Sequence, residues 1–107
     1  YFHFVDSTRR LGAEVPVVPG IMPFHNFGRI AQFAARDGID IPRWVTLKME
    51  GFMDDAASIR AFGLDVVTGL CERLIAGGVP GIHFYTMNQS ALTLELCTRL
   101  GLGPVAR

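Results

Sequence analysis

The sequence predicts an α/β fold in which short parallel strands alternate with helices. Residues 15–18 form an apolar segment that precedes a loop and a helical pattern, and residues 82–85 form a second one before a polar turn and another helical pattern. Because helices separate the two segments, we expect parallel pairing with right-handed crossovers. Strand, turn and helix in this order are the repeating unit of an α/β barrel, whose sites lie at the carboxyl ends of its strands.

The first element is expected to be the end of a helix over residues 1–11. Arg9 and Arg10 suit its last turn, where the helix dipole favours cations, and Gly12 is expected to end it. Residues 15–18 are β-branched or Pro and predict a buried strand. The residues after this strand are expected to form a loop.

Asn26 is well placed to cap a second helix that ends near Gly38. The apolar stripe of this helix is expected to comprise Phe27, Ile30, Ala31 and Ala34. Pro42 is expected to open a short third helix, which Gly51 ends.

The longest helix is expected to begin after Asp55 and to reach about residue 76. Its apolar residues recur every three or four positions, at Ile59, Phe62, Val66, Leu70 and Leu74. Gly63 and Gly69 each cost a helix roughly 1 kcal/mol relative to Ala, so we expect a neighbouring segment to approach closely at both. A helix over residues 90–100 completes the order.

The composition excludes several classes of protein. Ten basic and ten acidic residues balance in 107, so the basic surface of a nucleic-acid-binding protein is not expected. No apolar run approaches the ~20 residues that cross a bilayer, and the first residues lack the basic region of a signal peptide. We therefore expect a cytoplasmic protein. Because the chain starts without Met and inside a helical pattern, we also expect it to be part of a longer protein.

The cysteines and histidines do not predict a metal site. Cys71 and Cys97 lack the C-x-x-C spacing and are expected to be reduced packing residues. His3, His25 and His83 lie far apart and form no ligand motif. His83 alternates with apolar neighbours, which favours a satisfied core or interlayer histidine, and His25 is expected at the surface or at a cap.

Phe33 and Arg29 are the first candidate ligand-binding residues. They lie four residues apart, on a helix face away from the apolar stripe. A Phe on the polar side of a helix, backed by Arg, can form a stacking surface for a planar ligand. The alternative is that Phe33 packs against a neighbouring helix.

The turn over residues 86–89 is the second candidate. It follows the carboxyl end of a strand, where its hydroxyl and amide groups, including that of Gln89, could bind a heteroaromatic ligand. The alternative is that Asn88 or Ser90 caps the next helix. Tyr85 is expected to point opposite to Phe84, towards the rim of a barrel.

The acidic residues Glu50, Asp54 and Asp55 resemble a catalytic carboxylate set but are better explained as charges at helix ends. The glycine-rich residues 77–81 precede a strand instead of joining a strand to a helix. They are therefore not a phosphate-binding loop.

Four motifs carry a family resemblance. PGIMPFHNF at residues 19–27, IPRW at 41–44, DDAASIRAFG at 54–63 and VPGIHFYTMN at 79–88 occur in the order seen in methylenetetrahydrofolate reductases. The chain resembles this family from residue 1 to about residue 102. The resemblance implies the C-terminal fragment of a TIM (β/α)8 barrel, with residues 1–107 supplying its last two parallel strands and their helices.

The resemblance also implies an activity. These enzymes are FAD-dependent oxidoreductases that reduce 5,10-methylenetetrahydrofolate to 5-methyltetrahydrofolate, with NADH or NADPH reducing the flavin first, and they serve one-carbon metabolism and methionine biosynthesis. A family Phe at the position of Phe33 stacks on folate or on the nicotinamide. Many relatives have a glutamine that contacts folate where this chain has Arg29, and an arginine near the folate tail where it has Gln89. The resemblance therefore implies that Phe33, Arg29 and Gln89 bind substrate.

The family's catalytic glutamate and FAD contacts lie on earlier strands, so no catalytic residue is expected here. This chain alone is expected to be inactive, and the full-length protein is expected to be a homo-oligomer. Two alternatives stay open: a noncatalytic remnant or interaction fragment, and a related flavin barrel oxidoreductase with an altered substrate.

Overall fold

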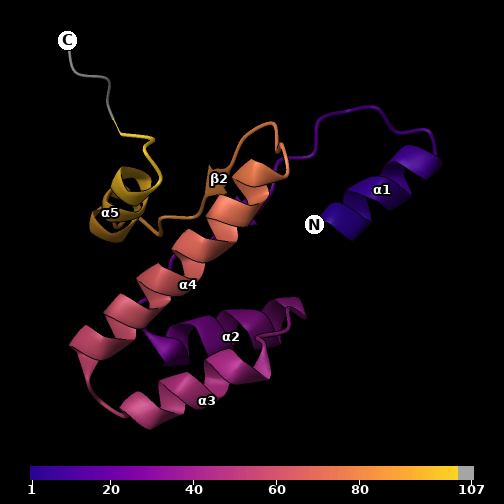
Figure 1. The fold of residues 1–107 in the computed structure, drawn as a ribbon. Coiled ribbons are helices and arrows are strands. Elements are labelled where there is room, and N and C mark those ends of the chain that lie inside the picture. The colour runs from indigo at the N-terminus through magenta and orange to yellow at the C-terminus, as the bar shows by residue number, and fades with distance from the viewer. Residues whose placement is uncertain (104–107) are drawn as a thin grey trace.

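The computed structural model describes residues 1–103, except for the side chain of Phe27. In chain order the described elements are α1 (Phe2–Arg10), β1 (Gly20–Ile21), α2 (Phe27–Asp37), α3 (Arg43–Phe52), α4 (Ala56–Ala76), β2 (His83–Phe84) and α5 (Ala91–Arg99). The two strands pair in parallel, with Gly20 opposite His83 and Ile21 opposite Phe84. The expected α/β class, with parallel strands joined across helices, is confirmed (Figure 1).

The first strand lies later in the chain than expected. Residues 15–18 are not a strand, and Val15 is 66% exposed, whereas β1 falls inside the expected loop. A strand needs a partner for its backbone groups, and β2 offers one only beyond residue 18: the N–H of His83 donates to the carbonyl of Pro19, and the N–H of Tyr85 donates to that of Ile21. The apolar composition alone therefore predicted the wrong residues.

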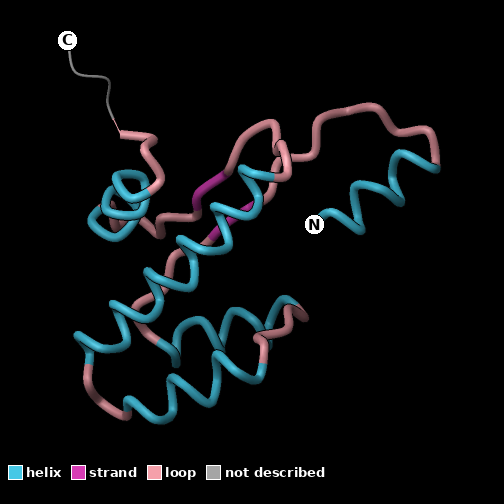
Figure 2. The backbone as a smooth tube through the Cα atoms, in the orientation of Figure 1, coloured by secondary structure: helices cyan, strands magenta, loops and turns pink. Residues whose placement is uncertain are grey.

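Side chains of α1 and of its N-cap residue donate hydrogen bonds to backbone carbonyls of the segment that was expected to be a strand. The Tyr1 hydroxyl donates to the carbonyl of Val17 at 2.8 Å, and the Arg9 guanidinium donates to that of Val15 at 2.9 Å. No residue of α1 is buried, and the helix stands apart from the others, joined to β1 by a long loop (Figure 2). Its contact with the rest of the molecule includes the Phe2 ring, which lies against Gly77 at the end of α4.

The other helices begin and end close to their expected positions. The side chain of Asn26 accepts a hydrogen bond from the N–H of Arg29 and so caps α2, and Gly38 ends this helix in a left-handed conformation. Asp55 caps α4 in the same way through Ser58. Pro42 precedes α3, which ends at Phe52, one residue after the expected Gly51.

The core lies between α3, α4, α5 and the face of the strands that carries Ile21 and Phe84. Its buried members are Ile21, Phe24, Val45, Met49, Leu64, Val67, Cys71, Leu74, Leu92 and Leu96, with Phe84 partly buried against them. The buried face of α4 is rotated from the expected stripe, because the helix contacts both α3 and α5. Leu70 is consequently 38% exposed. In α2, Ala34 is buried as expected, and Phe27 falls outside the described side chains.

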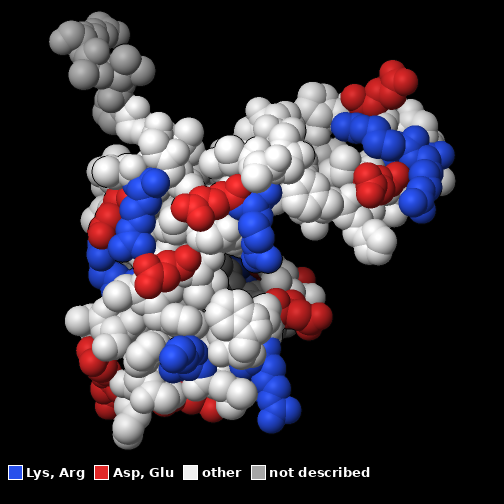
Figure 3. All heavy atoms as spheres, in the orientation of Figure 1, with Lys and Arg blue, Asp and Glu red and all other residues white. Residues whose placement is uncertain are grey.

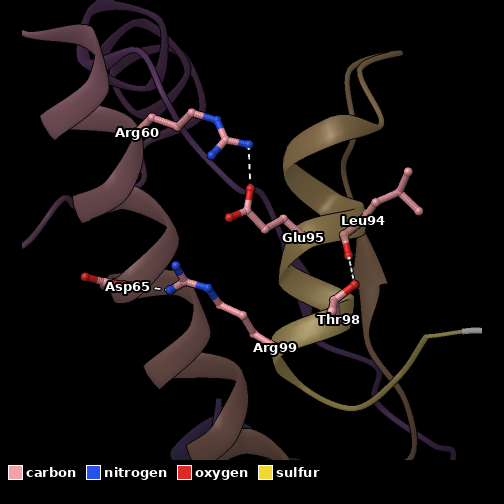
Figure 4. A network of polar contacts seen from close by, with 6 residues as sticks. All are labelled: Arg60, Asp65, Leu94, Glu95, Thr98 and Arg99. Atoms are coloured by element: carbon pink, nitrogen blue, oxygen red, sulfur yellow. Dashed lines mark hydrogen bonds and ion pairs between the residues drawn. The ribbon is translucent and has the colours of Figure 1, made fainter.

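Two ion pairs tie α4 to α5 beside this core. Arg60 of α4 binds Glu95 at 2.7 Å, and Arg99 of α5 binds Asp65 at 2.6 Å, so each helix supplies one cation and one anion (Figure 4). Both pairs are largely solvent-exposed and each contributes only about 0.2–1 kcal/mol.

The surface carries both signs of charge. Lys, Arg, Asp and Glu are interspersed on the face shown in Figure 3. Within residues 1–103, no helix combines the length and the apolar character that a membrane span requires.

Candidate functional site

An open hollow lies beyond the carboxyl ends of β1 and β2. We call it the strand-end hollow. Its lining includes Met22 and Phe24 after β1, Arg29 and Phe33 on α2, and Thr86 and Gln89 after β2. Segments more than fifty residues apart in the chain therefore meet at one place because the parallel pairing brings both strand ends to the same edge.

The cap of α2 sets the direction of the helix that carries Phe33 and Arg29. The Asn26 side chain binds the N–H of Arg29 at 3.0 Å, which fixes the first turn at the edge of the hollow. Phe33 follows one turn later and is half-buried. Both side chains line the same hollow, as residues of one helix face would, but Ile30 of the apolar stripe also lines it, so this face does not lie away from the stripe.

A tight turn brings the segment after β2 to the opposite side of the hollow. Met87 and Asn88 have φ values of 52° and 61°, and the N–H of Gln89 donates to the carbonyl of Thr86 at 2.9 Å. Thr86 and Gln89 line the hollow, whereas the side chain of Ser90 makes no capping hydrogen bond to α5. The turn therefore offers a hydroxyl and an amide to a ligand.

The electrostatics of the strand-end hollow are simple. Arg29 is exposed, and none of the described residues that line the hollow is Asp or Glu. The three ion pairs found within residues 1–103 do not include Arg29. A guanidinium without a nearby carboxylate can bind a carboxylate or another acceptor of an incoming ligand through two parallel hydrogen bonds.

The Phe33 ring is backed by a different arginine from the one expected. The guanidinium carbon of Arg36 lies 4.8 Å from the ring centroid, within the range of a cation–π interaction. Arg36 lies three residues after Phe33, and that spacing on a helix could have revealed the contact in the sequence. Arg29 instead lines the hollow beside the ring.

One of the two histidines near the strands lies where it was expected, and the other does not. His25 is exposed and lines the strand-end hollow, as a surface histidine would. The expected core position of His83 is wrong: His83 is exposed and its ring meets that of Tyr85 edge-on at 4.7 Å. Strand alternation explains this, because Phe84 faces the core and both neighbours of Phe84 face the other way, beside Gly20.

The remaining candidates have structural roles. The Ser58 hydroxyl and backbone N–H both donate to the Asp55 carboxylate, and these bonds lower the pKa of Asp55. Cys71 is buried and Cys97 half-buried, and neither forms a disulfide. Burial, with a smaller contribution from Cys97, raises the pKa of the Cys71 thiol, which therefore behaves as an apolar packing group. No group of metal-binding side chains occurs within the part of the chain described.

The fold and the hollow define an α/β protein with a candidate ligand site at the carboxyl ends of parallel strands. Residues 1–101 match the family described as Methylenetetrahydrofolate reductase. The chain belongs to this family.

Curated relatives give the same assignment. A 5,10-methylenetetrahydrofolate reductase of Salmonella typhimurium is 33% identical over 97% of this chain, and its Escherichia coli counterpart is 32% identical over 97%. A probable methylenetetrahydrofolate reductase (NADH) of Oryza sativa is 30% identical over 95% of this chain. The chain spans 35% of the length of the two bacterial relatives and 17% of the rice relative.

Proposed function

We propose that residues 1–107 are the C-terminal part of the (β/α)8 barrel of a methylenetetrahydrofolate reductase, a cytoplasmic oxidoreductase that acts as a homo-oligomer. Family membership supports the enzyme class. The coverage of 35% of the bacterial relatives and the parallel strands with helices between them suit one part of a larger barrel. Below, the intact protein means the longer protein that carries this chain.

The reaction we propose is the reduction of 5,10-methylenetetrahydrofolate to 5-methyltetrahydrofolate. FAD would carry a hydride from NADH or NADPH to the folate. The donor set of the strand-end hollow does not fit FAD itself, because Arg29 is the one permanent cation among its described lining residues and a pyrophosphate needs more donors. We therefore assign FAD binding to other parts of the intact protein and derive no step through it.

The residues of this chain would bind and orient the substrate. Phe33 would stack on a planar ring, and Arg29 and Gln89 would bind polar groups at the substrate's ends. The observation that supports these roles is that an exposed guanidinium, an amide and a half-buried aromatic ring, from α2 and from the turn after β2, line one hollow. Holding a reactant in one orientation is itself a large catalytic effect.

The proposal is tested with the variant Phe33→Leu in the intact protein. Loss of an aromatic pair worth about 0.5–1.5 kcal/mol should raise the KM for methylenetetrahydrofolate about two- to tenfold. The flavin absorbance spectrum should not change, since FAD binds elsewhere. The matched control is Gln32→Ala, an exposed neighbour on α2 outside the hollow.

Three outcomes decide the matter. Raised KM values for Phe33→Leu and for Arg29→Ala, with normal kinetics for the control, support the proposed site. Unchanged KM values in both site variants contradict it. An intact protein without flavin and without reductase activity supports the alternative of a noncatalytic remnant.

A further inference from the structure

The aromatic ring in the strand-end hollow has a charged residue on one side. The guanidinium carbon of Arg36 lies 4.8 Å from the centroid of the Phe33 ring. The Nε of Arg36 also binds the carboxylate of Asp37 at 3.2 Å, and the Arg36 side chain is 69% exposed. The two contacts together hold the guanidinium over the ring.

The residues that line the two hollows beside Phe33 show where Arg36 lies. Phe33 lines both the strand-end hollow and a second, mainly apolar hollow, which is bordered by residues of α2, α3 and α4. Arg36 lines the second hollow but not the first. Arg36 therefore does not itself border the strand-end hollow, and a ring that stacks there meets Phe33.

A cation over one face of an aromatic ring changes what the other face attracts. The ring's negative quadrupole draws cations to its faces, and Arg36 already uses this attraction. A second cation stacked on the same ring would lie close to Arg36 and would be repelled by it, which offsets part of its attraction to the quadrupole. A neutral planar ring keeps its dispersion and apolar contacts with Phe33.

We propose that Arg36 is a positioning residue that acts through Phe33 and makes the strand-end hollow select neutral planar rings over cationic ones. The inference rests on the proposed function. Its consequence there concerns the nicotinamide, which is neutral in the reduced dinucleotide and cationic in the oxidised one. Arg36 would favour binding of the reductant and release of its oxidised product. Asp37 offsets part of the charge, so the effect is modest.

The experiment compares two probes on the intact protein with its flavin oxidised, so that neither probe can exchange a hydride with it. NAD⁺ has a cationic ring, and tetrahydro-NAD has a neutral ring that cannot transfer a hydride; the phosphates of both are the same. Their dissociation constants are measured by calorimetry for the wild type, Arg36→Met, Arg36→Lys and Phe33→Leu, and for the double variant Phe33→Leu/Arg36→Met. The ratio of the two constants cancels any general effect of removing a charge near the phosphates.

We expect Arg36→Met to lower the ratio of the NAD⁺ to the tetrahydro-NAD dissociation constant about two- to fivefold, the factor expected of an exposed cation–π contact. Arg36→Lys should keep most of the wild-type ratio. In the Phe33→Leu background, Arg36→Met should lower the ratio by a smaller factor, because the ring that holds the ligand close to Arg36 is gone.

Each other outcome overturns a different claim. An unchanged ratio in Arg36→Met, with both probes bound, overturns the role of Arg36 and leaves the proposed function intact. An equal fall in the ratio with and without the ring shows direct repulsion and overturns the route through Phe33. Failure of the wild type to bind either probe contradicts nicotinamide binding in the proposed function and removes this inference with it.

Discussion

Gly63 of α4 lies directly against the backbone carbonyl of Phe24, in the segment that follows β1. A Cβ placed on Gly63 would overlap the carbonyl oxygen of Phe24 and would come within 3.1 Å of its ring. Phe24 lines the strand-end hollow. The contact with Gly63 therefore sets how closely the segment after β1 approaches α4. The absence of a side chain at Gly63 is therefore a condition for the geometry of the site.

Gly63→Ala is expected to destabilise the intact protein. The new methyl group meets a backbone oxygen that cannot rotate away, and overpacking of this kind costs about 1–3 kcal/mol. The matched control is Gly69→Ala in the same helix, where a Cβ meets nothing within 4 Å. That substitution should raise the free energy of unfolding by up to about 1 kcal/mol through helix propensity. Equal effects of the two substitutions in chemical denaturation would contradict the close contact.

The two glycines also show how far the sequence predicts the packing. Both interrupt a strong helical period, and the same close approach was expected at each. The prediction is confirmed at Gly63 and wrong at Gly69, which faces open space. A helical period gives the existence and length of an element, but the identity of the neighbour on each face depends on tertiary contacts that no local pattern contains.

Strands were harder to place than helices for a similar physical reason. Asn26, Gly38 and Asp55 are local signals, since each acts on backbone groups within its own helix, and all three mark the observed ends. A strand end depends on where its partner's hydrogen bonds begin. The partner of β1 lies more than sixty residues later in the chain.

The sequence predicted which residues make up the candidate site, but it did not predict the contacts between them. Phe33, Arg29 and Gln89 were expected to share a ligand site and do line one hollow, although their binding roles stay predictions. The contact between Arg36 and Phe33 was not foreseen. The helical spacing allowed it, but spacing alone does not decide which of two arginines lies over a ring.

Leu96→Ala is expected to be among the more destabilising substitutions in this chain. The side chain of Leu96 is 0% exposed and belongs to the core between α4 and α5. Removing it leaves a cavity and should lower the free energy of unfolding of the intact protein by about 2–5 kcal/mol. Leu94→Ala, in the same helix at a position that is 62% exposed, should change it by less than about 0.5 kcal/mol. Comparable losses in thermal unfolding would show that α5 does not pack as described.

The cap of α4 is expected to weaken in acid. The Ser58 hydroxyl donates to Asp55 at 2.7 Å and its backbone N–H donates at 3.2 Å, and both bonds favour the carboxylate, so the pKa of Asp55 in the folded protein is lowered. The stabilisation is therefore fully present above the unfolded-state pKa, at about pH 4. It is lost as the pH falls through the lower pKa of the folded state. Carbon NMR of the Asp55 carboxyl should show a midpoint below that of an unfolded peptide, and Ser58→Ala should raise it because the largest cause of the shift is removed. An unchanged midpoint in Ser58→Ala would disprove the assignment of the shift to this hydroxyl.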